Sequence, residues 1–226
     1  MKSNLDISVI ILAAGLSRRA GQDKQFFRIG RRYLVDITLK KFLDIPFVSR
    51  IVLVLSKENI KKYSGIFKNK KIMIVEGGKT RMESLLNGSK HIRDGSDLIM
   101  IHDGARPFVS STLIRRIALA TIKYEVVIPV MPLKDTVKEL SRDGRVLKTV
   151  NRASHFVVQT PQSYSRKFFD MLVENLDDID ATDDSQIIEN LGFDVHTVDG
   201  EDSNIKITTP LDLKIAKVIY EETERK

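Results

Sequence analysis

The chain has 226 residues, of which 42% are hydrophobic and 30% charged, and a formal net charge of +7. This is the composition of an ordinary globular protein, long enough to bury one core. It contains no cysteine, which excludes disulfides, thiolate zinc sites and cysteine nucleophiles. No apolar run approaches the roughly 18 residues of a membrane-spanning helix, so no membrane partner is expected.

The chain opens with a short apolar run, Ile7–Leu12, followed by Ala13-Ala14-Gly15. A secretory signal peptide would also end in small residues, but this run is too short and includes Ser8. A buried first strand is the better interpretation, and we expect a cytoplasmic protein. The positive charge favours small phosphorylated ligands. Nucleic acid is not expected as a partner, because no tract interleaves basic with aromatic residues.

Short apolar runs alternate with helical patterns through the first half of the chain. Strands are predicted at Ile7–Leu12, Ile51–Leu55, Ile72–Val75, Leu98–Ile101 and Val126–Val130. The clearest helix spans Thr80–Arg93 and opens with a capping box, in which Thr80 and Glu83 accept otherwise free backbone donors. This alternation predicts an α/β fold with a Rossmann-like, mostly parallel sheet flanked by helices. Ligands of such sheets bind at the carboxyl ends of the strands.

The alternation breaks between residues 133 and 159. Val137–Leu140 and Val146–Val150 flank Asp143-Gly144, a dipeptide typical of tight hairpin turns. We expect this segment to form a β-hairpin arm that projects from the main sheet. An isolated hairpin is marginal in water, so we expect the arm to pack against a second copy of the chain in a homodimer.

Helical patterns return at Ser165–Leu176 and Thr182–Leu191, and a strand is predicted at Val195–Val198. A last helix begins at Thr209-Pro210, with threonine as the cap and proline in the first turn. No repeat, low-complexity tract or flexible linker interrupts the chain. Residues 1–226 are therefore expected to form a single domain with the arm inserted into it.

The loop after the first strand has the composition of a phosphate cradle. The small residues Ala13-Ala14-Gly15 let backbone amides approach an anion, and Arg19 and Lys24 add positive charge. On this loop alone, a basic surface turn is an equally good interpretation. The dinucleotide fingerprint is excluded because its second glycine is missing. A P-loop ending at Gly78-Lys79-Thr80 is excluded because Met73 occupies its first glycine position.

Asp103 directly follows the fourth predicted strand. A carboxylate there, beside a phosphate loop, can hold a Mg²⁺ ion that also binds substrate phosphates. The alternative is that Asp103 pairs with Arg106 and merely shapes the turn. We expect His102 to be packed or hydrogen-bonded, because no other histidine lies at ligand spacing, and no zinc site is expected.

Taken together, these motifs resemble the 2-C-methyl-D-erythritol 4-phosphate cytidylyltransferase family of the non-mevalonate isoprenoid pathway. The resemblance runs from Val9 to about Leu213 and rests on segments that occur in the family's order. They are Ala13-Ala14-Gly15 with Arg19 and Lys24-Gln25; Gly77-Gly78 with Arg81 and Ser84; His102-Asp103 with Ala105-Arg106-Pro107; Asp135-Thr136; Arg152; Thr160-Pro161-Gln162; Thr182-Asp183; and Asn204 with Lys206 and Thr208.

The resemblance implies a reaction without a covalent enzyme intermediate, in which a phosphate oxygen of the acceptor attacks the α-phosphorus of CTP and pyrophosphate leaves. It implies that Arg19 and Lys24 stabilise the transition state and that Arg152 and Lys206 hold the acceptor phosphate. The residues that the resemblance places at the nucleotide are Ala13, Ala14, Gly15, Gly78, Arg81, Ser84 and Asp103, with Asp103 also the Mg²⁺ ligand. Those that it places at the acceptor are Arg106, Thr136, Arg152, Thr182 and Lys206. The arm matches the family's arm, which exchanges contacts across a homodimer.

The sequence departs from the family pattern at a few positions. Ser17 stands in place of glycine, the loop before Lys24 is about two residues shorter, and Asp23 replaces a proline. Gly104 and Asn151 replace alanine and aspartate. None of these changes removes a charged catalytic group.

Several alternatives stay open on sequence alone. A ribitol-5-phosphate cytidylyltransferase would share the nucleotide loop and the arm. A sugar-1-phosphate nucleotidylyltransferase is disfavoured by the cytosine-facing segment Gly78–Ser84, and a non-catalytic nucleotide-binding protein by the retained charged residues. Thr182 and Thr208 could equally be simple caps, and Arg152 and Lys206 could be solvated surface charges.

Overall fold

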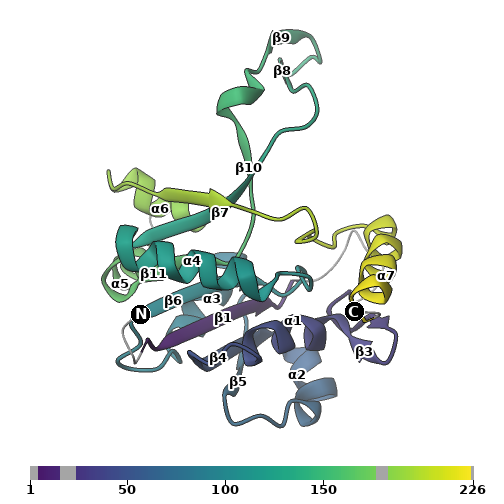
Figure 1. The fold of residues 1–226 in the computed structure, drawn as a ribbon, viewed down its shortest axis with the longest axis vertical. Coiled ribbons are helices and arrows are strands. Elements are labelled where there is room, and N and C mark those ends of the chain that lie inside the picture. Colours follow the sequence, from purple (N-terminus) through teal and green to yellow (C-terminus); the bar gives the residue numbers. More distant parts are fainter. Residues whose placement is uncertain (1–4, 16–23, 177–182, 225–226) are drawn as a thin grey trace.

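The computed structural model describes residues 5–15, 24–176 and 183–224. Within these ranges, eight strands form one sheet with helices on both faces (Figure 1). The sheet strands are β1 (Ile7–Ala13), β4 (Val48–Leu55), β5 (Ile72–Glu76), β6 (Leu98–Asp103), β7 (Val126–Pro132), β10 (Phe156–Val158), β11 (Gln162–Ser165) and β12 (His196–Asp199). The five strands predicted first are thus present, most of them one or two residues longer than predicted.

The strand order is β10-β7-β11-β6-β1-β4-β5, with β12 also paired to β7. β1 pairs in parallel with β4 and β6, β4 with β5, and β12 with β7. Within the described part of this sheet, only β10 and β11 run antiparallel to their neighbours. The mostly parallel α/β sheet predicted from the alternating pattern is therefore confirmed.

The helices cover both faces of this sheet. They are α1 (Leu34–Leu43), α2 (Lys57–Tyr63), α3 (Arg81–Ser89), α4 (Ser111–Tyr124), α5 (Arg166–Glu174), α6 (Ser185–Asn190) and α7 (Pro210–Glu224). Alternate side chains of β1 point to opposite faces. Val9 and Ile11 pack in one core with α1 and α4, whereas Ile10 and Leu12 pack in a second core with α3, α5 and α6.

The predicted helix starts are confirmed with one difference. The Thr80 hydroxyl accepts from the Glu83 amide at 3.0 Å, but the Glu83 carboxylate accepts from the Lys79 amide, one residue before the expected Thr80 amide. At α7, Thr209 accepts from the Asp212 amide at 3.3 Å, and Asp212 accepts from the Thr209 amide at 2.8 Å. This reciprocal pair satisfies donors that the helix start would otherwise leave free.

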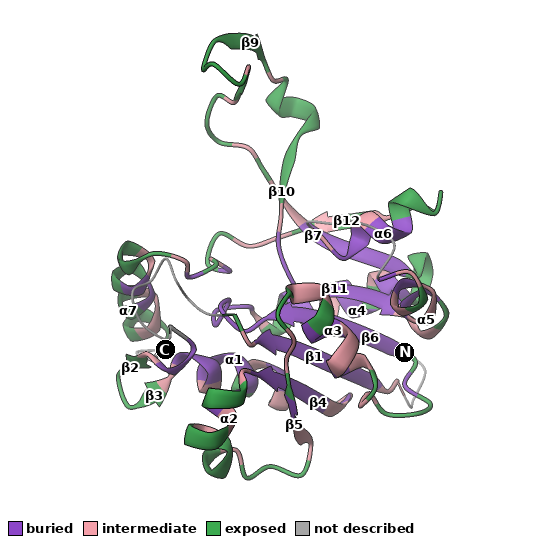
Figure 2. Ribbon diagram, turned by 180° about the vertical axis from the view of Figure 1, so that it is seen from behind, coloured by how far each residue is buried: buried purple, intermediate pink, exposed green. Residues whose placement is uncertain are grey.

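A narrow arm projects from one side of the sheet (Figure 1). Its tip is the hairpin of β8 (Lys138–Leu140) and β9 (Val146–Thr149), with Gly144 at φ 87°, a conformation that favours glycine. The arm is almost entirely exposed, in contrast to the buried strands of the sheet (Figure 2). β10, which lies within the range of about 133–159 predicted for the arm, pairs with β7 of the main sheet.

A second small hairpin, of β2 (Arg28–Ile29) and β3 (Arg32–Tyr33), precedes α1 and contacts α7. Three short 3-10 helices complete the described structure: η2 (Lys24–Phe26), η3 (Ser64–Ile66) and η4 (Arg152–Ser154). Over the described part of the chain, none of the helices combines the length and apolar character needed to cross a bilayer.

Candidate functional site

A cleft of about 750 Å³ lies at the carboxyl ends of four neighbouring parallel strands. We call it the strand-end cleft. β1, β4, β5 and β6 each contribute the residues that follow or end the strand, as expected for ligand sites in open parallel sheets. Its lining consists of Leu12, Ala14, Gly15, Gln25, Ser56, Lys57, Gly77, Gly78, Lys79, Thr80, Arg81, Ser84, Asp103, Ala105, Lys206 and Thr208.

One wall of the cleft is a closely packed glycine turn. A Cβ atom added to Gly77 would lie 2.4 Å from the Ala14 Cβ, and one added to Gly78 would lie 2.2 Å from the Glu83 Cβ. The Ser84 hydroxyl accepts from the Gly78 amide at 3.1 Å and donates to the Thr80 carbonyl at 2.8 Å. Ser84 therefore shapes the turn and also lines the cleft. Only glycine at positions 77 and 78 allows the turn to approach Ala14 and Glu83 this closely.

Asp103 is the electrostatic centre of the cleft. The Lys206 amine lies 2.7 Å from its carboxylate, and the guanidinium groups of Arg81 and Arg106 each lie at 3.7 Å. Burial opposes ionisation of Asp103, but the charges of Lys206 and Arg81 outweigh it and hold the pKa of the carboxyl well below its usual range. Asp103 is therefore a carboxylate at neutral pH.

Arg81 is fixed by a second acid that sequence reasoning missed. Both of its terminal nitrogens donate to the carboxylate of Asp184, which is fully buried. Burial raises the pKa of Asp184, and the charge of Arg81 opposes this shift. A two-pronged arginine–carboxylate pair fixes orientation as well as charge. Asp184 thus holds Arg81 at the cleft, and Asp184 itself lies behind it, directly before α6 and far along the chain.

Lys206 is held in place by a buried polar network beneath the cleft. Arg106 donates to the carbonyl of Asn204 at 2.8 Å, and the Asn204 amide donates to the carbonyl of Thr160 at 2.9 Å. The backbone of Ile207 donates to Ala105 at 2.9 Å. These bonds tie the extended segment that carries Lys206 to the loop after β6. The prediction that Arg106 contacts the acceptor stays a prediction, and here its donors point to the backbone.

His102 is packed beneath the same loop and is not available as a ligand. One ring nitrogen lies 3.0 Å from the Arg106 carbonyl and the other 3.1 Å from the Thr160 hydroxyl. Burial lowers the pKa of His102 to about 4. The expected structural role of this histidine is confirmed.

The comparisons with known proteins agree on one family. The model of the 2-C-methyl-D-erythritol 4-phosphate cytidylyltransferase family matches residues 7–222. The chain belongs to this family. It is 37% identical to the 2-C-methyl-D-erythritol 4-phosphate cytidylyltransferase of Clostridium novyi, over 94% of this chain and 95% of that protein. It is 38% identical to that of Clostridioides difficile, over 96% and 95% of the two chains.

Solved structures give the same result. A 4-diphosphocytidyl-2C-methyl-D-erythritol synthase from Anaerococcus prevotii superposes with a TM-score of 0.86 and 34% identity, covering 96% of this chain and 97% of the other. A 2-C-methyl-D-erythritol 4-phosphate cytidylyltransferase from Thermus thermophilus superposes with a TM-score of 0.78 and 30% identity, covering 95% and 98%. The resemblance inferred from motifs is confirmed over nearly the full length.

Most of the residues predicted to bind the nucleotide, and one predicted to bind the acceptor, lie together. The strand-end cleft contains Ala14, Gly15, Gly78, Arg81, Ser84, Asp103 and Lys206. Ala13 is the last residue of β1 and is buried just behind the lining. Lys24 begins η2, and the adjacent Gln25 is buried and lines the cleft. Arg19 and Thr182 lie outside the described residues.

Two family residues are not brought to the cleft within this chain. Thr136 and Arg152 are exposed at the base of the arm, and neither lines the cleft. The Arg152 guanidinium donates to the backbone carbonyl of Lys134 at 3.1 Å. The roles predicted for them stay predictions.

Ser56, Lys57 and Lys79 also line the cleft, and they belong neither to the quoted family residues nor to the predicted helix cap. The first two follow the carboxyl end of β4, the neighbour of β1. The rule that ligands bind at the ends of parallel strands could have found them. Lys79 lies within the glycine turn and could have been found from Gly78-Lys79-Thr80. No sequence pattern pointed to the pairing of Asp184 with Arg81.

The fit of a Mg²⁺ ion to these residues rests on Asp103 alone. The described residues contain no group of three or more histidines or acids that could hold a metal by themselves. Asp103 is ionised, lines the cleft and offers hard oxygen ligands. Mg²⁺ commonly takes one or two carboxylates and completes its shell with water and substrate phosphates. The donor set therefore suits a metal that arrives with a triphosphate.

Proposed function

We propose that this chain transfers the cytidylyl group of CTP to 2-C-methyl-D-erythritol 4-phosphate, giving 4-diphosphocytidyl-2-C-methyl-D-erythritol and pyrophosphate. The observation that carries the proposal is the match of the family model from residue 7 to residue 222, which includes every charged residue of the cleft. This product is a precursor in isoprenoid synthesis. We place the reaction in the cytoplasm, on the absence of cysteine from the chain.

The nucleotide half of the site is built from backbone. Ala14, Gly15 and Gly78 line the cleft and leave room for amides to approach the triphosphate, and Arg81 and Ser84, which also line it, are the residues proposed to contact the cytosine. Their orientation is set in advance by Asp184 and by the Thr80 carbonyl. Groups fixed before the substrate arrives cost little reorganisation during the reaction.

In the chemical step, an oxygen of the acceptor's phosphate attacks the α-phosphorus of CTP. The new phosphorus–oxygen bond forms as the bond to the bridging oxygen of the β-phosphate breaks, and the electron pair leaves with pyrophosphate. Arg19 and Lys24 stabilise the charge that builds on the α-phosphoryl oxygens. Lys206 and Arg152 position the acceptor's phosphate for in-line attack, with Arg106, Thr136 and Thr182 at the rest of the acceptor. Positioning and electrostatics account for catalysis of this type.

Asp103 would hold Mg²⁺, which when bound neutralises triphosphate charge. Lys206 contacts the Asp103 carboxylate directly, so the residue predicted at the acceptor and the residue predicted at the metal are adjacent. In this proposal Lys206 exchanges this carboxylate for the acceptor's phosphate, so that the two substrates bind at neighbouring groups of one cleft.

The active site is shared between two subunits, with Arg152 supplied by the partner's arm. The arm carries exposed apolar side chains at Leu140, Val146 and Leu147 that one chain leaves uncovered. Arg152 sits at the arm's base and does not line the cleft of its own chain. In a two-fold dimer this exchange must be reciprocal.

Subunit mixing tests the shared site. Lys24→Ala and Arg152→Ala proteins, each inactive alone, are mixed and allowed to exchange. Half of the dimers become mixed, and about a quarter of all sites then carry neither lesion. Recovery near that level supports the shared site, with exchange verified by tagged co-purification. No recovery under verified exchange contradicts it, because sites built within one chain always keep one lesion.

The function itself is tested by pyrophosphate release with CTP and each acceptor in turn. We expect turnover with 2-C-methyl-D-erythritol 4-phosphate and Mg²⁺, and little with UTP or ATP. Faster turnover with ribitol 5-phosphate would reassign the acceptor. Turnover without a divalent cation would remove the role given to Asp103.

A further inference from the structure

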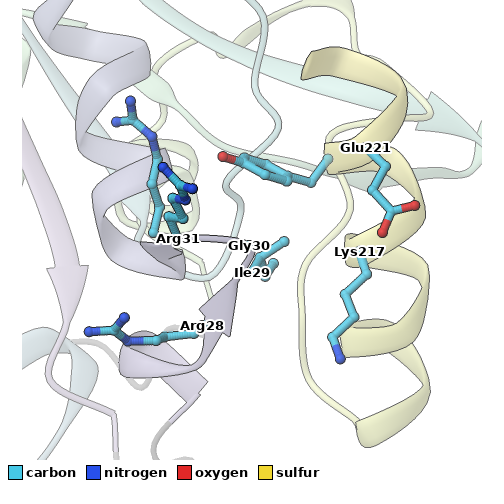
Figure 3. A pocket seen from close by; sticks show the side chains of 8 residues that line it. Arg28, Ile29, Gly30, Arg31, Lys217 and Glu221 are labelled. Carbon is cyan, nitrogen blue, oxygen red and sulfur yellow. The ribbon is translucent and has the colours of Figure 1, made fainter. Parts of the chain in front are cut away.

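A second cavity, of about 820 Å³, lies between the β2–β3 hairpin and helix α7 and shares no lining residue with the strand-end cleft. We call it the hairpin–helix cavity. Figure 3 shows Arg28 and Arg31 on the hairpin side and Lys217 and Glu221 on the helix. Its lining consists of Arg28, Ile29, Gly30, Arg31, Arg32, Lys217, Tyr220 and Glu221.

The local sequence explains why cations gather here. Ile29 pairs with Arg32 across a two-residue turn, and Gly30 adopts φ 58° at its first position, as a tight hairpin turn requires. The turn places Arg31 and Arg32 on the rim. On α7, Lys217, Tyr220 and Glu221 follow the three- and four-residue spacing that puts side chains on one helix face. The hairpin packs on this face, with a Cβ at Gly30 only 3.1 Å from the Tyr220 ring.

The cavity has an apolar floor and a strongly cationic rim. Ile29 is buried and Tyr220 half-buried, whereas Arg31, Arg32 and Lys217 are exposed. Within the described part of the chain, none of these three cations forms an ion pair.

The nearby acids and the fourth cation do not neutralise this rim. Asp36 accepts from the Tyr33 amide at 3.3 Å and does not line the cavity. Glu221 is the one carboxylate on the described lining. Arg28 turns instead to the Tyr33 hydroxyl, at 3.2 Å. The charge of Asp36 acts on Arg32 and Arg28, but four cations against Glu221 on the lining leave the cavity with an excess of positive charge.

We propose that the hairpin–helix cavity binds a di- or triphosphate group, separately from the catalytic cleft. Arg31 and Arg32 stand on the hairpin and Lys217 on the helix, and a linked polyphosphate offers more negative charge and more oxygens to these two elements than one monophosphate does. Arginine forks and a lysine point charge are the usual donors to such groups. The volume lies within the range of about 300–1,000 Å³ that is typical of small-ligand sites. The group can come from pyrophosphate or from a nucleoside triphosphate.

The test is a site-resolved NMR titration that does not depend on turnover. Pyrophosphate, CTP and inorganic phosphate are added separately to the full chain, and the amide signals of Gly30 and Gly78 are followed. We expect Gly30 to respond to pyrophosphate or CTP with its own saturation curve. The tighter of the two ligands identifies the source of the polyphosphate.

Matched variants assign the response to the cavity. Arg31→Gln/Lys217→Gln should weaken the Gly30 response by about tenfold or more and leave the Gly78 response unchanged, which also shows that the fold is intact. Lys68→Gln/Lys70→Gln removes the same charge from an exposed loop and should change neither response. A silent Gly30, an unchanged Gly30 response in the cavity variant, or equal binding of inorganic phosphate would each overturn the proposal.

Discussion

The side-chain amine of Lys206 lies 2.7 Å from a carboxylate oxygen of Asp103, although the two residues are far apart in the chain. This contact joins the strand-end loop of β6 to the extended segment before α7. It brings the group proposed for the metal next to the group proposed for the acceptor's phosphate. The cleft is thus organised around one buried carboxylate and the cations that surround it.

The first prediction concerns this contact. Lys206→Met should lower kcat/KM for the acceptor by about 100-fold, the loss typical when a preorganised charge is removed, with a smaller change in CTP binding. Steady-state kinetics with each substrate varied in turn measure the split. Lys214→Met, an exposed lysine on α7, is the matched control. Parent-level turnover of Lys206→Met would remove Lys206 from the mechanism.

The second prediction concerns the acid behind Arg81. Asp184→Asn keeps the shape but removes the charge that fixes the guanidinium. We expect a loss of about 1–3 kcal/mol in the free energy of unfolding and a higher KM for CTP with a smaller change in kcat. Urea unfolding and kinetics measure the two effects. Asp194→Asn, at an exposed position, should change neither. If KM for CTP stayed at the parent value, Asp184 would be structural only.

The third prediction is a pH dependence of stability that arises from His102. Its pKa is lowered to about 4 in the folded protein, so the unfolded chain binds the extra proton between about pH 6.5 and 4. The contribution of neutral His102 to the free energy of unfolding is fully present above this pH window. It is lost as the pH falls through the window. From pH 7 to pH 5, His102 should cost about 2 kcal/mol of unfolding free energy.

His102→Asn isolates this contribution from other groups, including Asp184, whose raised pKa acts in the opposite direction. Urea unfolding at pH 7 and pH 5 should show a smaller difference for the variant than for the parent. The same pH difference in both proteins would assign the effect elsewhere.

The fourth prediction concerns the exposed tip of the arm. Leu140→Ser/Leu147→Ser should convert the proposed dimer into monomers, because these side chains are more than half exposed in the single chain. Sedimentation velocity measures the change. Leu119→Ser/Ile122→Ser removes apolar side chains of similar exposure from α4 and should leave the dimer intact. A parent protein that sediments as a monomer would contradict the dimer itself.

The sequence allowed prediction of features that depend on local patterns. Apolar runs predicted the parallel strands, Asp143-Gly144 predicted the hairpin, and Thr209-Pro210 predicted the start of α7. Strand β11 was missed because Gln162–Ser165 is polar, and its burial depends on bonds such as that from the Tyr164 hydroxyl to Gln162 at 2.9 Å.

The site could be predicted only in part, because several of its contacts depend on packing between distant parts of the chain. Asp103 was predicted from its place at a strand end. The pairing of Arg81 with Asp184 was not, because it joins elements about a hundred residues apart and follows from packing. Arg106 matches a family motif, but its contacts with backbone carbonyls are set by the buried network beneath the cleft.

The most direct measurement is ³¹P NMR of the reaction of CTP with 2-C-methyl-D-erythritol 4-phosphate. We expect the phosphomonoester signal of the acceptor to disappear as two coupled diphosphate signals grow equally and one pyrophosphate signal grows with their combined intensity, because pyrophosphate contains two equivalent phosphorus atoms. That result shows the new bond between the acceptor's phosphate and the α-phosphorus. An unchanged acceptor signal, or CTP hydrolysis with no coupled pair, would contradict the proposed reaction.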